Sequence, residues 1–146
     1  MTTPAIQENI LKALIVHFDT LTLSPVLTVA YPGIAFTPPA TGMWIELAWI
    51  PNTADEPWLD NDAQVVERGI FQIGICDRLG VGEFPLNRAA DAVIEHFRKG
   101  TKMVSGPVTV RIEQRASRAP AVSYDTKVMT PVSVRYICIA PGIPAA

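Results

Sequence analysis

The stretch VERGIFQIGIC, Val66–Cys76, shows most clearly how this chain folds. Phe71, Ile73 and Ile75 alternate with polar or small residues, among them Gly74. This period of two predicts a β-strand with one buried face. A glycine within such a strand indicates a bulge or the close approach of a neighbouring backbone. We therefore expect a sheet at the centre of the fold, with this strand in it.

Four further segments have the composition of strands, since they are apolar or alternating runs bounded by proline, glycine or polar residues. They are Val26–Tyr31, Met43–Ile50, Val108–Glu113 and Lys127–Ala140. The second is apolar at nearly every position, which is typical of a strand covered on both faces. In the last segment Pro131 would remove one ladder donor, so we expect it at an edge, a bulge or a strand start.

Two helices are expected, one before and one after the central strands in the chain. An apolar stripe at steps of three or four predicts the first, with Thr3 as its cap, Pro4 in its first position and Pro25 beyond its end. The stripe consists of Ile6, Ile10, Leu14, Phe18 and Leu21. A similar pattern predicts the second over Leu86–Lys99, with Gly100 placed to stop it. The order α-β-β-β-α-β-β predicts an α+β fold: a mostly antiparallel mixed sheet of about five strands with two helices packed on one face.

Composition limits the class of protein. The 146 residues suit a single domain, 1–146, and 49% hydrophobic residues allow a core without metals or disulfides. The mean hydropathy of +0.24 indicates either a generous core or apolar surface kept for a partner. A net charge of −2 argues against a specific nucleic-acid partner. No apolar run is long enough for a membrane span and no signal peptide is visible, so we expect a protein made in the cytoplasm, with no membrane partner.

No catalytic or metal-binding pattern stands out. His17 and His96 have no nearby nucleophile or further ligands at the right spacing. Cys76 and Cys138 also lack metal spacing, and we expect buried thiols. The GVGEF segment lacks the full glycine fingerprint of a phosphate loop. We therefore expect no catalytic residue, cofactor or metal; a small enzyme or ligand-binding domain is an alternative that would need a polar cluster in a concave pocket.

Charged residues fall in separate blocks. From Glu46 to Glu67 there are six acids and no base, and from Arg98 to Arg118 there are six bases and one acid. Such blocks suit a solvated surface, but they also let copies pack head to tail in a ring. Trp58, within the acidic block, supplies an aromatic anchor of the type found in interface centres. The interface candidates from these blocks are Asp55, Glu56, Trp58, Asp60, Asp62, Arg111, Arg115 and Arg118.

A proline-rich connector, VAYPGIAFTPP, joins two of the expected strands over Val29–Pro39 and contains no nucleophile, acid or metal ligand. Its prolines restrict the backbone, so the connector loses less entropy when a partner orders it. We therefore add Tyr31, Pro32 and Phe36 to the interface candidates.

The motifs, in this order, resemble the small tail terminator-like proteins of tailed bacteriophages and prophages. The family has a Tyr-Pro-Gly-x-x-Phe-x-Pro segment before a strand, a Gly-x-Phe-Gln-Ile type of strand, an Ala-Asp-x-Val type of helix and a Pro-Val strand followed by an aromatic residue. The matching positions are Tyr31, Pro32, Gly33, Phe36 and Pro38, then Gly69, Phe71, Gln72 and Ile73, then Ala90, Asp91 and Val93, and finally Pro131, Val132 and Tyr136.

The resemblance implies a structural protein that forms a ring, six-fold in the best-understood members, on the end of the tail tube. The ring stops tube polymerisation and presents a surface to the head. The implied partners are further copies of the chain, the tail tube protein and the head connector protein. The implied location is the host bacterial cytoplasm during assembly and then the virion tail. Another head–tail joining (neck) protein or a tail tube subunit is the alternative. On this hypothesis the connector and the charged loops lie at subunit or tube contacts, and neutralising Arg115 and Arg118 weakens ring formation.

Overall fold

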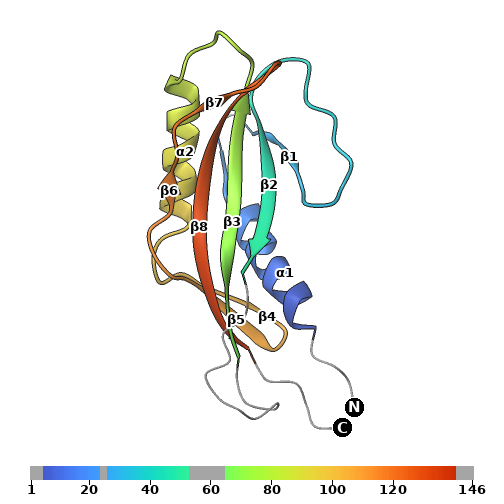
Figure 1. Cartoon of the computed structure of the whole chain (residues 1–146), viewed down its shortest axis with the longest axis vertical. Helices are drawn as coiled ribbons and strands as arrows, with labels where there is room; N and C mark the ends of the chain where they lie inside the picture. The colour runs from blue at the N-terminus through green and yellow to red at the C-terminus, as the bar shows by residue number, and fades with distance from the viewer. Residues whose placement is uncertain (1–4, 24–25, 53–64, 141–146) are drawn as a thin grey trace.

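The computed structural model describes residues 5–23, 26–52 and 65–140 (Figure 1). Within these ranges the chain forms two helices and eight strands. In chain order they are α1 (Ile6–Asp19), β1 (Thr28–Ala30), β2 (Trp44–Pro51), β3 (Val65–Asp77), α2 (Phe84–His96), β4 (Lys102–Ser105), β5 (Val108–Ile112), β6 (Ser117–Arg118), β7 (Val122–Ser123) and β8 (Val128–Ala140). No helix of the described residues is long and apolar enough to cross a membrane.

The strands of the described residues form one mixed sheet in the order β1-β2-β3-β8-β5-β4. β2, β3 and β8 run side by side along the long axis of the molecule (Figure 1). One edge of β8 pairs with β3, and its other edge pairs in turn with β5, β6 and β7. β1 is parallel to β2, whereas every other pair is antiparallel. The predicted α+β class is confirmed.

The core lies against one face of this sheet, as the alternation in β3 predicts. Phe71, Ile73 and Ile75 have no exposed surface. The register places Val134 opposite Phe71 and Val132 opposite Ile73, and both partners are also buried. Removing one such large side chain from water contributes about 1.5–3 kcal/mol to folding. Further members of the same hydrophobic cluster come from both helices and include Ile10, Leu14, Leu86, Ala90 and Val93.

The prediction of about five strands is wrong, because the described residues contain eight. β4, β6 and β7 were missed. β6 and β7 have two residues each, all exposed, so no alternation marks them in the sequence. β4 has a single buried residue, Met103. These short strands form because their backbones complete the hydrogen bonding of β5 and β8.

Helix boundaries also differ from the expected ones. α2 begins at Phe84 and ends at His96, rather than spanning Leu86–Lys99. Phe97 leaves the helical region, with φ −104° and ψ 61°, and its side chain is fully buried. Ala5 precedes α1 as its N-cap. The expected cap Thr3, with Pro4 and Pro25, lies outside the described residues.

Pro131 lies within β8 rather than at its start. The N–H of Ala119 donates to the carbonyl oxygen of Pro131 at 3.0 Å, so the missing N–H of the proline would point to the same side. On that side, residues 119–121 interrupt the ladder between β6 and β7. A long strand therefore accommodates this proline where no donor is required.

Candidate assembly interface

Most of the proline-rich connector lies in the crossover between two parallel strands. The crossover spans residues 31–43, between β1 and β2, and the first two connector residues, Val29 and Ala30, belong to β1. Parallel strands cannot be joined by a tight hairpin and need a crossover of about a dozen residues. Most such crossovers are helical, whereas this one contains no helix (Figure 1). The prolines therefore stiffen a segment that has no helical hydrogen bonds of its own.

The connector begins with a tight turn. The N–H of Ile34 donates to the carbonyl oxygen of Tyr31 at 3.2 Å. Pro32 occupies the first central position and Gly33, with φ +74°, the second. This is the residue pattern of a type II turn, in which the second central position favours glycine. The hydroxyl of Tyr31 donates to Oδ1 of Asp19 at 2.7 Å and so anchors the turn to the end of α1.

The far end of the connector is held by Arg78, which follows β3. Its guanidinium donates to the carbonyl oxygen of Pro39 and lies 5.3 Å from the ring centroid of Trp44. Between the two anchors, Ile34 is 66% exposed and Phe36 is half-buried. The connector thus presents apolar side chains on a segment that is tied down at both ends.

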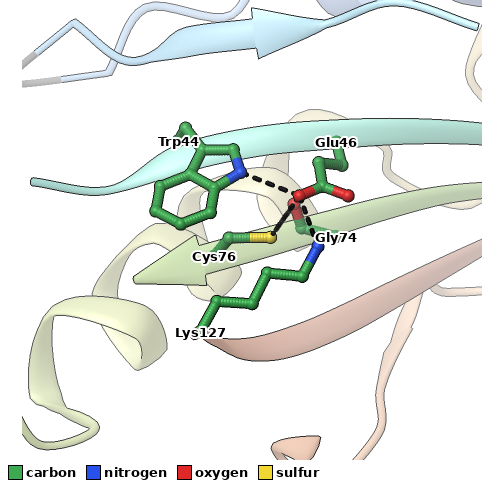
Figure 2. A network of polar contacts seen from close by, with 5 residues as sticks. All are labelled: Trp44, Glu46, Gly74, Cys76 and Lys127. Carbon is green, nitrogen blue, oxygen red and sulfur yellow. Dashed lines mark hydrogen bonds and ion pairs between the residues drawn. The ribbon is translucent and has the colours of Figure 1, made fainter. Parts of the chain in front are cut away.

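Trp44, which Arg78 contacts, also belongs to a polar cluster (Figure 2). Oε2 of Glu46 accepts hydrogen bonds from Nε1 of Trp44 at 2.8 Å, from Nζ of Lys127 at 2.7 Å and from Sγ of Cys76 at 3.4 Å. Sγ of Cys76 is also 3.8 Å from the carbonyl oxygen of Gly74. These contacts join β2 and β3 to the residue that precedes β8. The hydrogen bonds of the polar cluster join its own members, which is the arrangement of a structural cluster.

The electrostatics of the cluster agree with this role. Burial pushes the pKa of Glu46 upward, but hydrogen bonds from Lys127, Trp44 and Cys76 together hold it below the ordinary value. Burial, followed by the nearby Glu46 carboxylate, raises the pKa of Cys76 to about 12. Burial likewise raises the pKa of Cys138 to about 11. Both thiols are buried and free, so the prediction of buried cysteines is confirmed.

The structure separates the three arginines of the predicted basic block. Arg118 forms an ion pair with Glu83, at 3.4 Å, next to the start of α2. Arg115 lies beside Glu95 and Lys99, around the other end of that helix. Arg111 lies on β5, on the sheet. The other predicted candidates, Asp55, Glu56, Trp58, Asp60 and Asp62, lie outside the described residues.

The register shows which residues accompany Arg111. Lys102, Arg111, Ile137 and Arg68 stand directly opposite one another across β4, β5, β8 and β3. Directly paired residues share a face of the sheet. One step further along the strands, the same face continues with Arg135, Ile70 and Ile50, which again stand opposite one another. This surface is called the basic sheet face below, and it comprises Arg68, Lys102, Arg111, Arg135, Ile50, Ile70, Ile137 and Ile139.

The sequence reasoning missed most of this face. The alternation of Arg135 with buried neighbours in β8 was a usable signal. Lys102 could not be found, because β4 was not predicted. Within the described residues, no group of three or more His, Cys, Asp or Glu side chains could hold a metal ion.

With the fold and these surfaces established, comparisons assign the family. The sequence profile of a family described as phage tail terminator protein matches residues 9–136. The chain belongs to this family. The resemblance noted from the motifs is thereby confirmed, and the protein has a structural role in phage tail assembly as a component of the virion tail.

A solved structure has the same fold as this chain. The TM-score is 0.69 at 22% identity, over 92% of this chain and 96% of that chain. At this identity the likeness establishes the fold alone. No curated protein matches this chain.

Proposed function

We propose that this protein ends polymerisation of the tail tube by capping it as a ring, and that the ring then joins the head. The family match over residues 9–136 is the observation that carries the proposal. The proposed partners are further copies of the chain, six to a ring, together with the tail tube protein and the head connector protein.

Two surfaces suit such an assembly. The anchored connector, with Tyr31, Pro32 and Phe36, needs little further ordering when it binds. The basic sheet face is a chemically different surface. A ring is built from heterologous contacts, in which one surface of each copy meets a different surface of the next. Two unlike surfaces on one chain support this type of contact. Arg115 and Arg118, around α2, stay in the proposal as contacts to the tube or to a neighbouring copy.

The experiment is deletion of the gene in the phage or prophage that carries it. Tail lengths are then measured by electron microscopy of the lysate. Overlong, irregular tails without heads are the expected result, because an uncapped tube continues to grow. Complementation with the wild-type gene restores tails of regular length.

Other outcomes assign other functions. Tails of normal length that fail to join heads would indicate a neck protein. Absence of any tube would indicate a tube subunit or an initiation component. An unchanged, infectious particle would contradict an assembly function altogether.

A further inference from the structure

The basic sheet face places like charges directly opposite one another. Lys102 and Arg111 are cross-strand partners and both are exposed. Like charges directly opposite each other destabilise a sheet. Among the described residues, Lys102, Arg111 and Arg135 have no acidic partner at ion-pair distance, whereas Arg68 pairs with Glu113 at 3.4 Å. The face therefore carries positive charge that an acidic partner would neutralise.

The same face is apolar between its charges. Ile139 is 56% exposed and Ile50 is 48% exposed. Ile50 and Ile70 line a hollow of about 290 Å³ together with Arg68, Arg135 and Glu113, the ion-pair partner of Arg68. A hollow that combines isoleucine side chains with guanidinium groups suits a partner that carries an aromatic or aliphatic anchor and carboxylates. Nucleic acid offers phosphates but does not bury isoleucine, so the isoleucines favour a protein partner.

A segment with this chemistry occurs in the chain itself. Residues 53–64 have the sequence TADEPWLDNDAQ, with four acids, no base, and Trp58 and Leu59 at the centre. The basic sheet face has three bases without an acidic partner among the described residues, Lys102, Arg111 and Arg135, beside Arg68, which pairs with Glu113. Charge and apolar content are therefore complementary between segment and face.

We propose that residues 53–64 of one copy bind the basic sheet face of the next copy in the ring. This inference rests on the proposed function, because it names the contact that builds the ring. The segment starts after β2 and ends at β3, whereas Lys102 and Arg111 lie on β4 and β5. A contact between the segment of one copy and the face of the next joins two unlike surfaces, so it is heterologous, as a ring requires.

The test uses two charge-reversed variants of the full chain. The face variant carries Lys102→Glu, Arg111→Glu and Arg135→Glu. The segment variant carries Asp55→Lys, Asp60→Lys and Asp62→Lys. A matched control reverses three exposed bases elsewhere, Lys12→Glu, Arg88→Glu and Lys99→Glu. Circular dichroism and thermal unfolding of each purified variant establish that it folds.

Each variant is expressed alone, and then both together, in the deletion host. Alone, each sets like charges against one another at every contact, and we expect loss of regular tails to the level of the deletion. Together, the two variants alternate around a ring of even order, and every contact again joins opposite charges. We expect co-expression to restore regular tail length. Purified face and segment variants, mixed at low salt, should also form a larger species in size-exclusion chromatography than either forms alone.

Several outcomes would overturn the inference. A face variant that restores tails as wild type does would show that the face makes no essential contact. If the matched control loses regular tails to the same extent, the effect is a general one of charge and not of this face. If the two variants together fail to restore regular tails, but a single chain with both sets of reversals restores them, the segment binds the basic sheet face of the same copy. The wild-type protein could instead bind a DNA duplex in a salt-sensitive way, and the face variant could lose this binding. If the mixed variants also fail to assemble, the face would be assigned to nucleic acid.

Failure of the proposed function is distinguishable from these results. If deletion leaves tail length unchanged, the capping function fails, and the purified mixture still decides whether face and segment bind between copies. If deletion gives overlong tails but the variants behave as wild type, capping stands and the contact is wrong.

Discussion

His17 and His96 bind each other reciprocally at the ends of the two helices. Nε2 of His17 lies 2.9 Å from the carbonyl oxygen of His96, and Nε2 of His96 lies 2.8 Å from the carbonyl oxygen of His17. Their rings stack with centroids 4.3 Å apart, and the edge of Phe97 packs against both. The hydroxyl of Thr20 lies 2.9 Å from Nε2 of His96. This pair joins α1 to α2, which accounts for both histidines by a structural role.

Stability should fall as the pH is lowered through the titration range of His17. Burial, followed by the charge of His96, holds the pKa of His17 below its ordinary value despite the hydrogen bond to the His96 carbonyl. The folded state therefore binds this proton less readily than the unfolded chain. The resulting stability is present above the unfolded pKa of 6.5 and is lost as the pH falls through the folded value.

The measurement is the urea unfolding free energy of wild type and of His17→Gln at about pH 7.5 and about pH 5.5. The variant does not titrate there, so its loss on acidification should be smaller than that of wild type. At the higher pH, His17→Phe should lower the unfolding free energy by about 0.5–1.5 kcal/mol more than His17→Gln does, because phenylalanine cannot form the hydrogen bond to the carbonyl oxygen of His96. Identical pH dependence in wild type and His17→Gln would contradict the assignment.

Gly69→Ala should destabilise the protein more than Gly74→Ala. A Cβ at position 69 would contact the Tyr136 hydroxyl, and would lie 2.7 Å from Cζ of that ring and 2.8 Å from the carbonyl oxygen of Ile50. The Tyr136 ring cannot move easily, because it is buried and its hydroxyl accepts a hydrogen bond from Nε1 of Trp49 at 2.9 Å. Overpacking of this kind costs about 1–3 kcal/mol.

Gly74→Ala is the matched control. Its nearest contact is Sδ of Met129 at 2.6 Å, at the flexible end of a side chain that can rotate away. Thermal unfolding of both variants measures the difference. Equal midpoints would show that the packing at position 69 relaxes as readily as that at position 74.

The ion pair between Glu46 and Lys127 should couple the two residues by about 1 kcal/mol, since both are only partly buried. A double-mutant cycle with Glu46→Gln and Lys127→Met measures this coupling. The folded pKa of Glu46 is lowered, so its contribution is present above the unfolded value of 4.5 and disappears as the pH falls through the folded value. Coupling that is absent at neutral pH, or unchanged in acid, would argue against the cluster as described.

Cys76 and Cys138 should not react with thiol reagents in the native protein. Only the thiolate is nucleophilic, and pKa values of about 12 and about 11 leave almost none of it at about pH 8. Labelling should become complete in denaturant. Val104→Cys, at a position 71% exposed on β4, supplies a reactive control. Rapid labelling of native wild type would show that either strand opens readily.

Local pattern was sufficient to predict the elements that carry the core. The alternation of Phe71, Ile73 and Ile75 predicted β3, and the spacing of Ile10 and Leu14 predicted α1. Each signal lies within one segment, because burial of one face imposes the period of that element on its own residues. The ordered motifs also identified the family. They did so without any single catalytic or binding residue.

Pairing between distant segments was decided only in the tertiary structure. The exposed strands β6 and β7 form because the free edge of β8 supplies backbone partners, which no side-chain pattern records. The parallel pairing of β1 with β2 explains why a stiff crossover is needed. The row of Lys102, Arg111 and Arg68 depends on the register of four strands, two of them far apart in sequence. Charge blocks show how many bases a chain has, but only the register determines which of them share a face, because a slip of one residue moves a side chain to the opposite side.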